Sequence, residues 1–324
     1  MTDGAAERGT PARVLLDCDP GIDDAFAIVF GCGHPGLDLA GLTTVSGNVN
    51  LGTVTGNALS VLELAGRPDV PVVPGSARPL LRPTLDAREV HGEGGLGAAR
   101  LPAAQARPAP GHAVDYLIDT IGAAPGEITL VATGPLTNIA LAVRREPRLA
   151  GWVRDFVIMG GSAGRGNVTP AAEFNIAADP EAAAIVFEAG WRVTMVGLDV
   201  TLQARAGPDV QDRMRQLGRL GADLLLPGLL GYRGEHAQAA GGAPVHDVCA
   251  LALVAEPGLF GCAPARVDVE TAGRWTSGMT VTDFTADPAA RNALVAMTVD
   301  VPAFWDLVLD AYAAIPAAAT ASRS

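Results

Sequence analysis

The feature that most constrains the fold is an alternation of short apolar strands with helical patterns. The predicted strands are residues 13–19, 37–47, 127–133, 155–161 and 191–200, and the predicted helices between them are residues 23–33, 53–66, 134–147 and 179–190. Parallel neighbours in a sheet need a crossover connection, which is usually a helix. The predicted class is therefore α/β, with an open, mainly parallel, Rossmann-like sheet flanked by helices.

The rest of the chain departs from this alternation. Residues 74–110 are interrupted by prolines and glycines and keep no long period, which is typical of a functional loop or of disorder. Residues 265–270 and 278–284 predict a hairpin, and residues 304–315 predict a closing helix. No repeat or clear linker divides the sequence. We therefore expect one domain over 13–315, a disordered N-terminal extension over 1–12 and a disordered tail over 316–324.

Composition excludes several classes of protein. A net charge of −12 argues against a nucleic-acid partner, and no apolar run approaches the roughly 18 residues of a membrane span. The N-terminus lacks a hydrophobic signal region, so we expect a cytoplasmic protein. All 23 basic residues are arginine. This excludes a lysine Schiff base and a lysine-containing phosphate loop.

The sequence "DCDPGIDD" places four carboxylates at the end of the first predicted strand. Asp17 and Asp19 share a face of the strand, and Asp23 and Asp24 open the following helix. One of them, Asp17 or Asp24, could serve only as structural support. Four close carboxylates are better explained by a hard divalent cation, Ca²⁺ or Mg²⁺, which prefers oxygen ligands.

Other polar segments follow predicted strands at the same edge. They are residues 46–48, Thr133 and residues 159–161. Ligands of open α/β sheets bind outside the carboxyl ends of the strands, so these segments are expected to converge on one crevice.

Six motifs in order carry a resemblance to a known family. They are "LDCDPGIDDAFAI", "TTVSGNVN", "VHGEGGLG", "ATGPLTNIALA", "IMGG…GNVTPAAEFNIAADPEAA" and "VHDVCALA". Over residues 13 to about 310 the chain resembles the inosine-uridine nucleoside hydrolases. The resemblance implies the nucleoside hydrolase fold, a homodimer or homotetramer, and hydrolysis of the N-glycosidic bond of a ribonucleoside to ribose and free base with the help of one Ca²⁺.

The resemblance also implies a set of metal ligands and catalytic groups. Asp19, Asp24 and Asp247 match carboxylate ligands of the cation, and the backbone carbonyl of Thr133 completes the protein set. Asp19 matches the general base that activates a metal-bound water, and His246 matches a histidine near the leaving base. Asp17 is expected to support this group from behind.

The ribose contacts follow from the same resemblance. They are Asp23, Asn48, Asn167, Glu173, Asn175 and the backbone of Met159. Candidate base contacts are His91, Trp275, Tyr232 and His236. For Trp275, stacking on a base and a place as a half-buried hairpin aromatic are equally supported.

Two other functions stay open. A metal-dependent phosphohydrolase with an Asp nucleophile also begins with Asp-x-Asp, but it usually continues with Gly-Thr and uses a later lysine, both absent here. A non-catalytic nucleoside-binding protein on the same fold would conserve the pocket without turnover. The preferred base, whether purine, pyrimidine or either, is not predicted.

Overall fold

The sheet that organises the molecule is built around its first strand. The computed structural model describes residues 10–233 and 241–316. In this part of the chain, a nine-stranded sheet has the order β10-β9-β11-β6-β5-β4-β1-β2-β3. The strands are β1 (Ala12–Cys18), β2 (Leu37–Thr44), β3 (Val72–Pro74), β4 (Ile128–Ala132), β5 (Asp155–Met159), β6 (Val193–Val196), β9 (Phe260–Val269), β10 (Thr280–Asp283) and β11 (Ala293–Val299).

Strand pairing confirms the predicted class. All neighbours from β3 through to β11 are parallel. Strand β9 pairs antiparallel with β11 and with β10, so the predicted hairpin is also confirmed. A separate two-stranded sheet joins β7 (Arg205–Ala206) to β8 (Ala243–Pro244).

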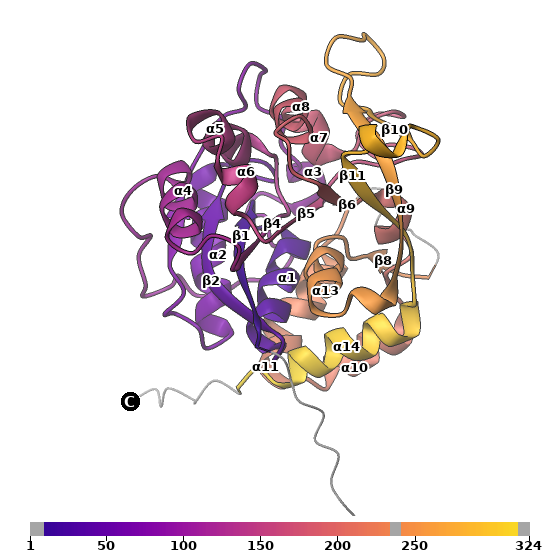
Figure 1. Ribbon diagram of the computed structural model, residues 1–324. Helices are drawn as coiled ribbons and strands as arrows, with labels where there is room; N and C mark the ends of the chain where they lie inside the picture. The colour runs from indigo at the N-terminus through magenta and orange to yellow at the C-terminus, as the bar shows by residue number, and fades with distance from the viewer. Residues whose placement is uncertain (1–9, 234–240, 317–324) are drawn as a thin grey trace, which may run out of the picture.

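Helices cover both faces of the sheet, as Figure 1 shows. On one face lie α1 (Ile22–Gly33), α2 (Leu51–Leu64), α13 (Val248–Ala255) and α14 (Val301–Ala313); on the other lie α4 (Ala113–Ala123), α5 (Thr137–Arg145) and α8 (Pro180–Phe187). Adjacent residues of β1 show the two layers: Leu16 belongs to the first core and Leu15 to the second, and both are fully buried. Strands covered on both faces are continuous apolar runs, which explains "VLL" in this strand.

The remaining helices are short. They are α3 (Arg88–His91), α6 (Leu149–Trp152), α7 (Phe174–Ala178), α9 (Leu198–Thr201), α10 (Pro208–Arg215), α11 (Gly218–Leu220) and α12 (Leu226–Leu230). Residues 75–112 between β3 and α4 are mostly loop and contain only α3, as their broken periodicity predicts.

Some boundaries differ from the prediction. Strand β1 begins at Ala12, one residue before the predicted domain start, because Ala12 donates its backbone N–H to Gly36 and pairs with Leu37. The helix predicted over 134–147 begins only at Thr137, since the preceding residues form a turn at the site. No strand was predicted for β11, which lies between β6 and β9.

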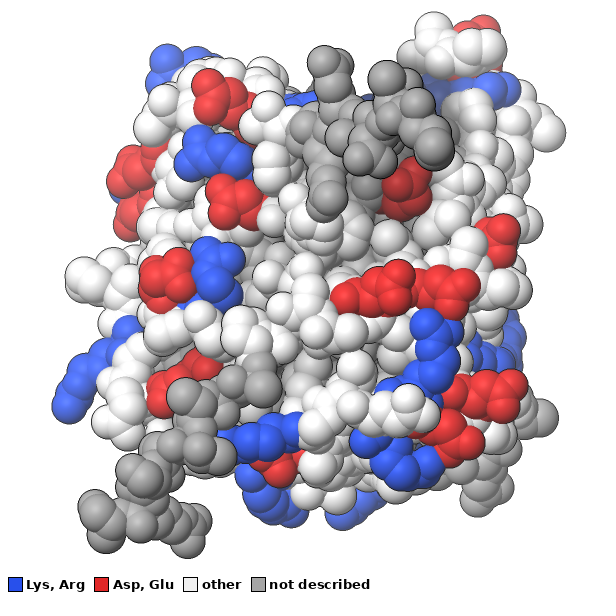
Figure 2. All heavy atoms as spheres, turned by 90° about the horizontal axis from the view of Figure 1, so that it is seen from below, with Lys and Arg blue, Asp and Glu red and all other residues white. Residues whose placement is uncertain are grey.

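Two further findings concern the helices and one face of the molecule. Among the described residues, no helix is long and apolar enough to cross a membrane. Figure 2 shows acidic and basic side chains interspersed on the face seen from below. This face lacks the continuous basic stripe that nucleic-acid binding needs.

Candidate active site

Asp17 lies beneath the site and joins neighbouring elements. Its Oδ1 accepts hydrogen bonds from Thr43 Oγ1 at 2.5 Å and from Asn138 Nδ2 at 2.8 Å. The side chain is fully buried, and this burial raises its pKa to about 7. Asp17 thus ties β1 to β2 and α5 without reaching the cavity above.

Asp19 follows β1 directly and is also fully buried. Its Oδ2 accepts the backbone N–H of Asn48 at 2.6 Å, whereas its Oδ1 has no hydrogen-bond partner among the described residues. Two glycines make room for this carboxylate: a Cβ on Gly47 would lie 2.1 Å from Oδ2, and one on Gly134 would lie 2.7 Å from Oδ1. Burial and the nearby Asp24 raise the pKa of Asp19 well above its usual range.

Asp24 is held by a full set of donors at the start of α1. These are the backbone N–H groups of Gly21 at 3.1 Å and Asp19 at 3.3 Å, Asn48 Nδ2 at 3.1 Å and Thr133 Oγ1 at 2.9 Å. The carboxylate therefore closes the first turn of the helix, as the capping interpretation predicts. It also lies close to two other acidic side chains, those of Asp23 and Asp247.

Three buried carboxylates form a group that could hold a metal ion. One oxygen each of Asp23, Asp24 and Asp247 lies within 4.8 Å of the others. Asp247 occupies the N-cap position of α13, but its side chain makes no capping hydrogen bond there. Burial raises the pKa of all three, that of Asp23 to about 7, and neighbouring carboxylates raise the pKa of Asp23 and Asp247 further. Oxygen-only ligands suit a hard cation.

This group overlaps with the predicted ligand set but is not identical to it. Asp24 and Asp247 are common to both, whereas the three-residue group contains Asp23 and the predicted set contains Asp19. Asp19 lies next to Asp24, and its backbone N–H donates to that carboxylate.

A cavity of about 340 Å³ opens above the carboxylates. The predicted site residues that line it are Asp23, Asn48, His91, Thr133, Met159, Asn167, Glu173, Asn175, Tyr232, His246 and Asp247. Asp19 and Asp24 are fully buried beneath its floor. Trp275 is 77% exposed on the β9–β10 loop and is not among the lining residues, so of the two alternatives for this side chain the half-buried hairpin position is wrong. The open turn lets its ring lie on Arg274 instead. His236 falls outside the described residues.

One side of the cavity is an amide and carboxylate network around α7. Asn175 Nδ2 donates to the carbonyls of Thr133 at 2.8 Å and Met159 at 3.0 Å. Glu173 Oε2 accepts the backbone N–H groups of Gly161 at 2.9 Å and Ile176 at 3.2 Å. Burial raises the pKa of Glu173 to about 7. The Thr133 carbonyl keeps a second lone pair for another ligand.

Two histidines and a tyrosine also line the cavity. His246 Nδ1 lies 2.8 Å from Thr201 Oγ1. His91 Nδ1 accepts the backbone N–H of Ile22 at 3.1 Å, so in the neutral ring its proton is on Nε2. The rings of Tyr232 and His91 meet edge-on with their centroids 5.7 Å apart, and the Tyr232 hydroxyl forms a hydrogen bond with Asp23.

Sequence reasoning missed several lining or supporting residues. Thr201 orients His246, and Phe174, Val168 and the segment 85–90 form much of the outer wall. Thr201 comes directly after a predicted strand, so the rule about carboxyl ends could have found it. The loop 85–90 lies within residues 74–110, where a functional loop was one expectation, and Val90 belongs to the motif "VHGEGGLG". No local pattern singled out residues 85–89.

Comparisons with known proteins show the family to which the chain belongs. The model of the family described as "Inosine-uridine preferring nucleoside hydrolase" matches residues 14–306. The inosine-uridine preferring nucleoside hydrolase of Leishmania major is 46% identical, over 93% of this chain and 97% of that protein. The non-specific ribonucleoside hydrolase of Salmonella typhi is 45% identical, over 94% and 98% respectively.

Solved structures share the fold as well. The purine-preferring ribonucleoside hydrolase from Gardnerella vaginalis superposes with a TM-score of 0.87 at 33% identity, covering 94% of this chain and 98% of that one. With the family match over nearly the whole chain and the buried acidic floor in place, the protein is an enzyme of the inosine-uridine preferring nucleoside hydrolase family.

Proposed function

We propose that this enzyme hydrolyses the N-glycosidic bond of ribonucleosides to ribose and free nucleobase, with Ca²⁺ held at the floor of the cavity. The observation that carries the proposal is the cluster of buried carboxylates below a cavity lined with amides and carbonyls. Burial raises the pKa of all three acids, that of Asp23 to about 7, and a bound cation would favour their ionised forms.

The residues present fit a calcium ion. Asp19 Oδ1 is a buried oxygen without a hydrogen-bond partner among the described residues, and the Asp247 carboxylate is not used as a helix cap. With Asp24 and the Thr133 carbonyl they form an oxygen-only set, which suits Ca²⁺ better than zinc. We assign these four groups as the protein ligands. When bound, the cation would hold the ribose hydroxyls and lower the pKa of the attacking water.

Individual side chains are then assigned separate roles in hydrolysis. Asp19 accepts a proton from the attacking water as general base. Asp23 accepts the hydrogen bond of a ribose hydroxyl. The remaining ribose contacts are Asn48, Asn167, Glu173, Asn175 and the Met159 backbone. Their oxygens stabilise the positive charge that develops on the sugar in an oxocarbenium-like transition state.

His246 is assigned as the acid that protonates the departing base. Its ring lines the cavity, and its Nδ1 lies 2.8 Å from Thr201 Oγ1, which fixes the ring beside the substrate. His91 and Tyr232 lie on the same side and are assigned to the base. The named preferences of the relatives differ, so the preferred base depends on this chain's own outer wall. A homodimer or homotetramer in the cytoplasm is part of the proposal.

A panel of inosine, uridine, cytidine, adenosine and guanosine tests this function directly. We expect free ribose from at least one of them with Ca²⁺ present, and a loss of turnover by about 10³-fold or more in Asp19→Asn. Release of phosphate from an aryl phosphate would instead support a phosphohydrolase. Calorimetric binding of a nucleoside without ribose release would support a binding protein.

A further inference from the structure

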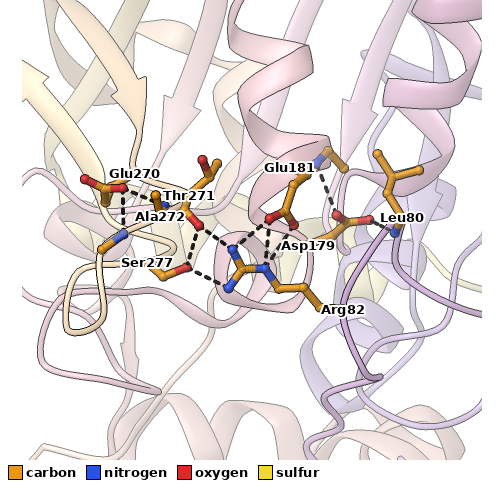
Figure 3. A network of polar contacts seen from close by, with 10 residues as sticks. Leu80, Arg82, Asp179, Glu181, Glu270, Thr271, Ala272 and Ser277 are labelled. Atoms are coloured by element: carbon orange, nitrogen blue, oxygen red, sulfur yellow. Dashed lines mark hydrogen bonds and ion pairs between the residues drawn. The ribbon is translucent and has the colours of Figure 1, made fainter.

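The Arg82 side chain connects two elements that are far apart in the sequence (Figure 3). Its Nε donates to both carboxylate oxygens of Glu181 at 3.0 Å, and Nη2 donates to Oε1 at 2.7 Å. The same guanidinium donates to the Thr271 carbonyl and, at 2.8 Å, to Ser277 Oγ. It thereby joins the first turn of α8 to the β9–β10 loop.

The partners of Arg82 are themselves held in place. Glu270 Oε1 accepts the backbone N–H groups of Ala272 at 2.7 Å and Gly273 at 2.9 Å, which shapes the turn that presents the Thr271 carbonyl. At α8, buried Asp179 caps the helix through Ala182 and accepts the Leu80 backbone N–H at 2.8 Å. Leu80 and Arg82 are thus both held at the start of α8, Leu80 by Asp179 and Arg82 by Glu181.

Three residues beyond Arg82, the chain becomes the outer wall of the cavity. Residues 85–87 and 89–91 line it. Among the described residues, this wall is also held by hydrogen bonds to its backbone or to His91. They are Ala87 N–H to the Asn48 carbonyl at 3.0 Å, Arg233 N–H to the Val90 carbonyl at 3.2 Å, Gly97 N–H to the His91 carbonyl at 2.8 Å and Ile22 N–H to His91 Nδ1 at 3.1 Å. Thr84, Asp86 and Glu89 are exposed, so little apolar burial holds the wall. Where burial is small, polar anchors decide local order.

We propose that Arg82 is a positioning residue: it does not touch substrate but holds the wall 85–91 against the nucleobase end of the cavity. This rests on the proposed hydrolysis of nucleosides. An ion pair near the surface contributes little to stability by itself. A guanidinium that donates at once to a carboxylate, a carbonyl and a hydroxyl nevertheless fixes the positions of these groups relative to one another, which lysine cannot do. The ribose floor around α7 and the acidic cluster hold their own hydrogen bonds without Arg82.

The test compares Arg82→Ala with Arg78→Ala, an exposed arginine earlier on the same loop. Hydrogen exchange read by mass spectrometry should show faster deuterium uptake in peptides covering 83–91 of Arg82→Ala, with unchanged uptake over 25–33 of α1. In the same variant, KM for a nucleoside should rise on the order of tenfold, because the wall is displaced. The inhibition constant of free ribose should stay within about twofold of wild type, since the floor is intact. For Arg82→Lys, deuterium uptake over 83–91 and KM should lie between those of wild type and Arg82→Ala. For Arg78→Ala, both quantities should match wild type.

Each result decides the proposal. Unchanged uptake over 83–91, an unchanged KM, or a ribose inhibition constant that rises in parallel with KM would overturn it. If Arg82→Ala does not fold, Glu181→Gln and Arg82→Lys provide the same comparison. If wild type releases no ribose from any nucleoside, the proposed function fails, while the exchange measurement still tests whether Arg82 holds the wall.

Discussion

Asp24 and Asp247 face one another under the cavity, each with a carboxylate oxygen within 4.8 Å of the other. One opens α1 beside the first strand, and the other stands at the start of α13. The two carboxyls share a hydrogen bond, which requires a proton on one of them. Burial raises the pKa of both groups, and a cation bound between them would favour their ionised forms.

Asp247→Asn should therefore weaken calcium binding more than it weakens the fold. Removing one charged ligand is expected to abolish the rise in Tm on adding Ca²⁺ and to reduce ribose release by about 10²-fold or more. Calcium titrations followed by calorimetry and thermal melts measure both effects. Asp310→Asn, at an exposed position on α14, is the matched control and should behave as wild type. An Asp247→Asn protein with the wild-type calcium response would remove Asp247 from the ligand set.

The stability of the chelator-treated protein should fall as pH rises. Burial raises the pKa of Asp17, Asp23 and Glu173 to about 7, so between about pH 4 and pH 7 the folded state binds more protons than the unfolded state. Stability is then lost through this window, because these acids ionise in the unfolded state while the folded state keeps their protons. We expect Tm to be lower at pH 8 than at pH 5 by on the order of 5 °C.

Calcium provides the control for this pH effect. At pH 8, saturating Ca²⁺ should recover much of the lost Tm, since it lowers the pKa of the carboxylates it binds. A metal-free protein that is equally stable at both pH values, or more stable at pH 8, would contradict the raised pKa values.

Thr201→Val should impair the step that needs His246. The hydroxyl lies 2.8 Å from His246 Nδ1 and fixes the orientation of the ring, so its loss should lower kcat by roughly tenfold and move the pH profile of kcat. A double-mutant cycle with His246→Ala isolates this effect. In the His246→Ala background, Thr201→Val should lower kcat only slightly further. A further tenfold loss of kcat in that background would show that Thr201 acts independently of the histidine.

Trp275→Ala should leave catalysis nearly unchanged. The indole is 77% exposed, rests against Arg274 at 4.6 Å and lies outside the cavity lining. We expect kcat/KM within about twofold of wild type for every nucleoside hydrolysed, as is usual for exposed substitutions. A selective loss with one base would show that the β9–β10 loop reaches the substrate.

The order of elements was predictable because alternation of strand and helix is a local property of the chain. Buried β1 and the first turn of α1 follow directly from "RVLLDCDPGIDD". Strand β11 was missed, although it pairs with β6 and β9. Its short apolar run had no clear partner in the sequence, and strand pairing between distant segments is a tertiary property.

The candidate site was predictable to a similar degree. Residues at the carboxyl ends of strands converge by topology, which brought Asn48, Thr133 and Met159 to the cavity. Asp247 and Glu173 entered only through resemblance, because nothing local distinguishes them from helix caps. The exposure of Trp275 and the contacts of Arg82 depend on how irregular loops pack, which periodicity does not encode.

The most direct test of the account is the calcium dependence of ribose release. The enzyme is stripped with a chelator, the chelator is removed, and ribose release from its best nucleoside is followed while Ca²⁺ is titrated. The account predicts no measurable release without the cation and a saturable recovery of the full rate with it, which Asp19→Asn lacks at every concentration. Full-rate release from the stripped enzyme, or from Asp19→Asn, would contradict it.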